Sequence, residues 1–121
     1  MKIDFITIFT DDTEKSTNFY TNILGFKFDN QIKLPNNLLL TFLKDDGGLT
    51  VELVNSGEPV EKPTKSPVAL TIELEDISTA LEIVKKADYP IELEPIILPT
   101  GMKMMHILDP NGVIINFIQM S

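Results

Sequence analysis

Two side chains of this 121-residue sequence are the strongest candidates for chemistry: Glu52 in "LTVELV" and His106 in "KMMHIL". His106 is the only histidine, so any general base or metal ligand that uses an imidazole has to be this residue. Glu52 interrupts an apolar run, where its carboxylate either bonds to a polar neighbour such as Thr7 or Thr50 or binds a basic ligand. For His106 the alternative is a packing residue on a strand. Both questions depend on which face of a strand each side chain occupies.

Composition excludes several other kinds of site. The sequence has no cysteine, which rules out disulfides, thiolate metal sites and a cysteine nucleophile. It also lacks a glycine-rich phosphate loop, a serine nucleophile elbow and a pair of histidines at metal-ligand spacing. The formal net charge of −8 disfavours binding to nucleic acid or to an anionic membrane surface, and it suits a neutral or cationic ligand.

The N-terminal run "MKIDFITIFTDD" has neither the charge pattern of a signal peptide nor the length of a membrane span. We therefore expect a cytoplasmic protein. With 43% hydrophobic and 23% charged residues, the chain has the balance of a folded globular domain.

Hydrophobic periodicity divides the sequence into two similar halves. Residues 1–55 predict a strand, a helix and three more strands, and residues 67–121 predict the same order again. The proline-rich residues 56–66 are typical of an exposed connector. The expected strands span residues 2–10, 26–34, 37–44 and 49–54 in the first half, and 68–75, 91–99, 103–108 and 113–118 in the second.

The two expected helices have recognisable ends. The first begins after Asp11 or Asp12, either of which can cap it, and it ends at Gly25. Asp76 caps the second helix, which has a stripe of apolar residues at helical spacing. We expect this stripe, Ile77, Ala80, Leu81, Val84 and Ala87, to be buried.

A constant offset of 64 positions relates the two halves without any insertion. It joins the capping residues Asp12 and Asp76, and likewise Pro35 to Pro99, Asp45 to Asp109 and Gly48 to Gly112. The sequence therefore predicts an α+β fold of two tandem βαβββ modules in a single domain spanning residues 1–121. Two such modules would form a curved mixed sheet with a concave face, here called the trough, where a ligand can bind.

Strand alternation predicts which side chains face the trough. It places Phe5, Thr7 and Phe9 there from the first strand and Ala69 from the matching strand. The turn "DPNG" favours a type I turn followed by a bulge, which puts His106 opposite Asn116; by the repeat, Phe42 lies opposite Glu52. The residues expected to contact a ligand are Phe5, Thr7, Phe9, Phe42, Glu52, Ala69, Met104, His106 and Asn116.

The segments "DFITIFTDDTEKSTNFYTNILGF", "TVELV", "VALTIELEDISTALEIV" and "HILDPNGVIINFI" together resemble the vicinal oxygen chelate superfamily. This group contains glyoxalases, bleomycin resistance proteins and extradiol dioxygenases, and the likeness covers essentially the whole chain. In metal-using members, His, Glu or Gln side chains on the first and last strands of each module hold a divalent ion. The resemblance places Phe5, Glu52, Ala69 and Asn116 at these positions, and only Glu52 is an ordinary ligand. We therefore expect no metal cofactor, with a divalent metal ion as the alternative.

Three functions follow as hypotheses from the resemblance and from the residues that line the trough. The first is a metal-independent protein that sequesters a small apolar or cationic organic compound, such as an antibiotic, without chemistry. The second is a metal-dependent lyase, isomerase or dioxygenase that uses Glu52 and His106 as catalytic residues. The third is an interaction domain whose trough is filled. We also expect a homodimer, because family members commonly pair and an exposed sheet edge favours association.

Overall fold

The computed structural model describes residues 1–64 and 66–121. It divides into two compact units, Met1–Lys62 and Pro63–Ser121. The boundary between them falls within the expected connector at residues 56–66. Each unit is described below by itself.

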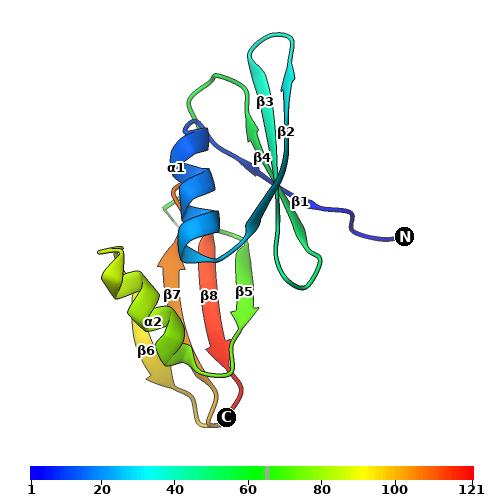
Figure 1. The fold of residues 1–121 in the computed structure, drawn as a ribbon. Coiled ribbons are helices and arrows are strands. Elements are labelled where there is room, and N and C mark those ends of the chain that lie inside the picture. Colours follow the sequence, from blue (N-terminus) through cyan, green and yellow to red (C-terminus); the bar gives the residue numbers. More distant parts are fainter. Residues whose placement is uncertain (65) are drawn as a thin grey trace. The chain divides into compact units, whose positions relative to one another are not determined.

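The first unit contains one four-stranded sheet and one helical segment (Figure 1). Its elements are β1 (Ile6–Phe9), α1 (Thr13–Asn18), η1 (Phe19–Ile23), β2 (Lys27–Leu34), β3 (Leu38–Lys44) and β4 (Thr50–Asn55). The strands lie in the order β1-β4-β3-β2. β1 runs parallel to β4, and the other neighbours are antiparallel.

The second unit repeats this topology. Its elements are β5 (Ala69–Glu73), α2 (Ile77–Lys86), β6 (Leu93–Ile97), β7 (Lys103–Leu108) and β8 (Ile114–Gln119). The strand order is β5-β8-β7-β6, with β5 parallel to β8. The predicted α+β fold with two βαβββ modules is therefore confirmed. The trough, which requires the two sheets to lie together, stays a prediction.

Aspartates begin both helices, as predicted. Of the two candidates in the first unit, Asp12 is the N-cap, and its carboxylate accepts a hydrogen bond from the Lys15 backbone N–H at 3.0 Å. Asp76 caps α2 by accepting from the Ser78 hydroxyl at 2.7 Å and from the Ser78 N–H at 2.9 Å. Both hydrogen bonds lower the pKa of Asp76, and the one from the Ser78 hydroxyl has the larger effect.

Asp11, the other candidate for the cap of the first helix, has a different role. Its carboxylate accepts a hydrogen bond from the Val60 backbone N–H at 2.9 Å, so it holds the connector rather than the helix. The first helix also departs from regular α-helical geometry, because Phe19–Ile23 form a π-helical turn. In this wider turn the consecutive rings of Phe19 and Tyr20 are both buried, 5.1 Å apart in an edge-to-face contact.

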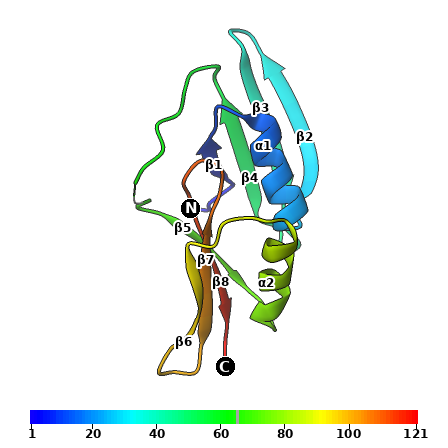
Figure 2. The same cartoon turned by 90° about the vertical axis from the view of Figure 1, so that its left-hand side faces the viewer.

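Each helix lies beside one face of its own sheet (Figure 2), and the core of each unit lies between them. In the first unit the core consists of Ile8, Phe19, Tyr20, Phe26, Leu43, Val51 and Leu53. In the second it consists of Ile77, Ala80, Val84, Met105, Ile107, Ile115 and Phe117. The predicted stripe of α2 is thus buried at three positions, whereas Leu81 is half-buried. Ala87 is exposed because it is the C-cap residue.

The two closing hairpins use the same turn. Asp45 accepts from the Leu49 N–H at 2.7 Å, and Asp109 accepts from the Val113 N–H at 2.8 Å. Gly48 and Gly112 follow with φ of 92° and 89°, a conformation that favours glycine. The predicted turn at "DPNG" is confirmed: the Asp109 N–H donates to the Val113 carbonyl at 2.8 Å, and the Gly112 N–H donates to the Asp109 carbonyl at 3.2 Å.

The edge strand of the second sheet is shorter than expected. β6 covers only Leu93–Ile97 of the predicted 91–99, and its register shifts between Leu93 and Ile96. Pro95 lies at this shift, and proline cannot donate a hydrogen bond to a neighbouring strand. Among the residues that the structure describes, no helix has the length and hydropathy needed to cross a membrane.

Candidate functional site

Glu52 lies between two partners on one face of the first sheet. On the parallel side Thr7 is its register partner, and on the antiparallel side Phe42 is, as the repeat predicted. The Thr7 hydroxyl donates a hydrogen bond to Glu52 Oε1 at 2.7 Å. We call this side of the first sheet, which faces away from α1, the Glu52 face.

The Glu52 side chain is buried although it carries a carboxylate. Glu52 is only 9% exposed. Phe5, just before β1, contacts the Phe42 ring edge to face, with ring centroids 5.9 Å apart. A carboxylate with an aromatic pair beside it combines one negative charge with rings whose faces attract cations.

More apolar side chains share the Glu52 face than the sequence analysis named. Phe9 and Val54 are register partners, and Phe9 is 62% exposed. Sequence reasoning followed only the strands next to Glu52, so it missed the pairs that β2 and β3 contribute. These pairs are Ile32 with Leu40 and Leu34 with Leu38. They lie two and four residues along β2 from Asn30, the partner of Phe42, so strand alternation could have predicted them.

The second sheet presents the equivalent positions with different chemistry. His106 lies opposite Asn116, as predicted, and Thr71 is the parallel partner of Asn116. Asn116 Nδ2 and Thr71 Oγ1 are 3.5 Å apart, at the limit of a hydrogen bond. Met104 pairs with Ile118 on the same face, and Ala69 lies exposed at the start of β5.

The 64-residue repeat therefore compares two versions of one arrangement. Threonine is kept at positions 7 and 71, whereas Glu52 corresponds to Asn116 and Phe42 to His106. The first version combines a carboxylate with an aromatic ring, and the second combines an amide with an imidazole. Within residues 1–64 and 66–121, the Oδ1 atom of Asn116 is buried without a hydrogen-bond partner.

The chain matches the model of the Glyoxalase/Bleomycin resistance protein/Dioxygenase superfamily over residues 2–117. It belongs to that superfamily. The predicted resemblance is thereby confirmed. A search of curated proteins found no match.

Solved structures of the superfamily share the fold. The chain is 26% identical to a trypanothione-dependent glyoxalase I from Leishmania major, with a TM-score of 0.82. The match covers 98% of this chain and 86% of that one. The chain is 21% identical to a glyoxalase family protein from Enterococcus faecalis, with a TM-score of 0.77 and coverage of 98% and 97%. A lactoylglutathione lyase from Agrobacterium tumefaciens is 18% identical, with a TM-score of 0.71 and coverage of 98% and 92%.

The donors on each sheet do not fit the metal site that the superfamily resemblance implies. Such a site needs about three nitrogen or oxygen donors. Phe5 and Ala69 provide none, so the implied positions offer one carboxylate, from Glu52, in the first sheet and one amide, from Asn116, in the second. The residues beside them add the hydroxyls of Thr7 and Thr71 and the imidazole of His106. In the described part of the chain, no three His, Asp or Glu side chains come together as a metal-binding group.

Proposed function

We propose that this superfamily member is a metal-independent small-molecule-binding protein that holds an organic ligand on the Glu52 face. The observation that carries the proposal is the buried Glu52 carboxylate, which bonds to Thr7 beside the Phe5–Phe42 aromatic pair. A carboxylate set among apolar side chains has the composition of a ligand site, in which a few polar groups orient a largely apolar molecule. Sequestration of a compound such as an antibiotic requires only this binding.

The exposure of the surrounding side chains supports the same proposal. Phe5 and Phe9 are 40% and 62% exposed, and Ile32 and Leu34 are also exposed on this face. Contiguous exposed apolar side chains commonly mark a surface that binds something. A ligand with an apolar body would cover them.

A screen by thermal unfolding tests this function. Protein dialysed against EDTA would be heated with a library of small organic compounds, and we expect some of them to raise the melting temperature. Glu52→Gln should reduce the shift that the best compound produces. Glu82→Gln is the matched control, the same substitution at an exposed position of α2, and it should leave that shift in place.

The second candidate function is a metal-dependent lyase, isomerase or dioxygenase in which Glu52 and His106 act on the substrate. Its support is the likeness to structures that are described as glyoxalase I and lactoylglutathione lyase. Elemental analysis of protein purified without chelator separates the two candidates. One nickel, zinc, iron or manganese ion per chain, lost in Glu52→Gln, would favour the enzyme and contradict the first proposal.

A further inference from the structure

The Glu52 carboxylate has spare acceptor capacity. Oε1 accepts the Thr7 hydroxyl, and among the described residues no hydrogen bond reaches Oε2. The ion pairs in the described part of the chain are Lys2 with Asp4 and Lys44 with Asp29, so neither of them involves Glu52. A carboxylate this buried is stabilised by a cation that approaches its free oxygen.

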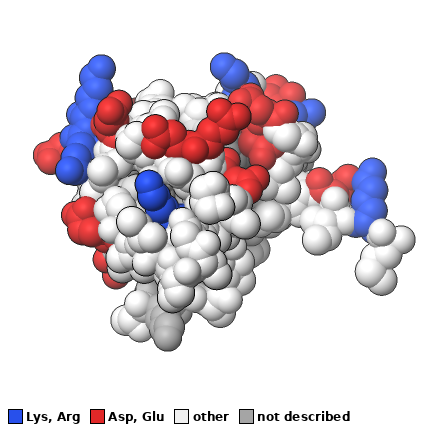
Figure 3. Space-filling view, turned by 90° about the horizontal axis from the view of Figure 1, so that it is seen from below, with Lys and Arg blue, Asp and Glu red and all other residues white. Residues whose placement is uncertain are grey.

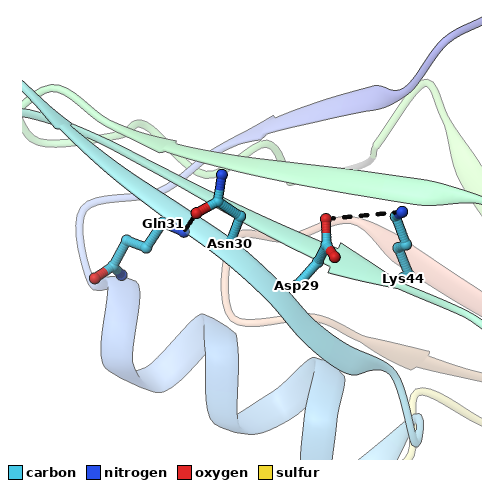
Figure 4. A network of polar contacts seen from close by, with 4 residues as sticks. All are labelled: Asp29, Asn30, Gln31 and Lys44. Carbon is cyan, nitrogen blue, oxygen red and sulfur yellow. Dashed lines mark hydrogen bonds and ion pairs between the residues drawn. The ribbon is translucent and has the colours of Figure 1, made fainter.

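Lys44 is the basic residue of the neighbouring strand β3 that shares a face with Glu52. It lies on the Glu52 face, two residues along β3 from Phe42, and its register partner is Thr50. Its side chain points to Asp29 instead, with Nζ 3.7 Å from Asp29 Oδ2 (Figure 4). Asp29 occupies the register shift in β2 that brings its carboxylate to this position.

Among the described residues of the first unit, no ion pair joins a lysine to Glu52. All ten basic residues are lysines, so no arginine is available to form a two-pronged pair with the carboxylate. Carboxylates are spread over the surface seen in Figure 3, in keeping with the formal net charge of −8. This field attracts cations from solution and repels anionic ligands.

The aromatic rings select among cations. Phe5 and Phe42 stand nearly perpendicular, at 87°, beside the carboxylate. Ring faces attract ammonium groups, and they bind those with apolar substituents well because such groups are weakly hydrated. A bare divalent ion would find only one carboxylate and one hydroxyl here, which is too few donors.

We infer that the ligand of the Glu52 face is an organic cation, an amine or quaternary ammonium group on an apolar body. The inference rests on the proposed function and names its ligand class. The ammonium group approaches Glu52 and the rings of Phe5 and Phe42, and the apolar body covers Phe9 and the apolar residues of β2 and β3.

Two probes of equal shape and different charge test the inference. These are (4-hydroxyphenyl)trimethylammonium and 4-tert-butylphenol, titrated by NMR into protein dialysed against EDTA. We expect the ammonium compound to bind about five- to tenfold more tightly than the phenol. In Glu52→Gln the preference should fall to about two- to threefold or less, which is the share that the rings contribute, with the phenol affinity unchanged within about twofold.

Two further variants make the test specific. Asp46→Asn removes one carboxylate from the exposed turn before β4, and it should keep the preference for the ammonium compound. Phe5→Leu retains apolar area but loses a ring, and it should reduce the preference about two- to threefold.

Equal binding of both probes by the wild-type protein would overturn the inference and leave metal-independent binding in place. A preference that is undiminished in Glu52→Gln would overturn it in the same way. Binding of neither probe would also overturn it, and if the library screen gave no melting shift either, the proposed function would fall too.

Discussion

At the scale of single residues, the repeat provides an internal comparison for Glu52. Thr7 and Thr71 occupy equivalent positions, but Thr7 donates to a carboxylate at 2.7 Å, whereas Thr71 is 3.5 Å from an amide nitrogen. A short bond to a charged acceptor is stronger than a long contact between neutral groups. The same residue type should therefore matter more in the first unit than in the second.

Thr7→Val removes the hydroxyl and leaves the Glu52 carboxylate without its donor. We expect the free energy of unfolding to fall by about 1–2 kcal/mol, because a buried acceptor loses its partner. Thr71→Val is the matched control and should cost less than about 0.5 kcal/mol. Urea unfolding of both variants measures the difference. Equal losses would show that Thr7 does not stabilise the carboxylate.

Tyr89 gives a prediction about pH. Its hydroxyl donates to the Leu108 carbonyl, and burial, with a smaller contribution from the Asp109 charge, raises its pKa to about 12 from 10.0. The folded state therefore favours the neutral phenol. The stability that this provides is complete below pH 10 and is lost as the pH rises from about 10 to 12.

Comparison of wild type with Tyr89→Phe isolates this effect from the lysines that titrate in the same range. The variant should be less stable at pH 8 by about 1 kcal/mol, because the bond to Leu108 is lost. The difference between the two proteins should shrink toward pH 12. A constant difference across the range would contradict the assignment.

At the scale of elements, the two hairpin turns share their hydrogen bonds but differ in their surroundings. A Cβ atom at Gly48 would meet nothing within 4 Å, whereas one at Gly112 would lie 3.2 Å from Pro63 Cδ. Both glycines have a positive φ that other residues adopt with strain. Only the second turn is therefore also limited by packing.

Gly48→Ala should lower the free energy of unfolding by about 1–2 kcal/mol through backbone strain alone. Gly112→Ala should cost about 1 kcal/mol more, because its methyl group crowds Pro63. Gly47→Ala is the control: its φ is not positive and its Cβ would make ordinary contacts with Asp45. Chemical denaturation measures all three variants. A larger loss in Gly48→Ala than in Gly112→Ala would contradict the packing argument.

Local chemistry explains which elements could be predicted from the sequence. The caps at Asp12 and Asp76 and the turn at "DPNG" depend on residues a few positions apart, and the registers opposite Glu52 and Asn116 follow from those turns. The π-helical turn and the hydrogen bond from Val60 to Asp11 were not predicted. They depend on packing and on contacts between distant residues, which periodicity does not encode.

The candidate site was predictable in part for the same reason. Alternation and the repeat placed Thr7, Phe42 and Glu52 on one face, and the register confirms this placement. Sequence could not show that Lys44 turns to Asp29, because that pair depends on the register shift in β2. Ligand binding by the nine predicted residues stays a prediction.

At the scale of the whole molecule, we expect the chain to form a homodimer. Every residue of β2 is exposed, and the edge strand β6 carries the exposed apolar residues Ile96 and Ile97. Exposed edge strands favour association with another chain. Sedimentation at micromolar concentration should give twice the chain mass of 13.6 kDa. A monomer at 100-fold higher concentration would contradict the expectation.

The central claim is that a small organic molecule binds the Glu52 face without a metal ion. The most direct measurement is an NMR titration of EDTA-treated protein with the best compound from the thermal screen, with assigned backbone and side-chain signals. The account predicts shifts concentrated at Phe5, Thr7, Phe42 and Glu52 that saturate without added metal. Shifts that appear only after a divalent ion is added, or that leave these four residues unchanged, would contradict it.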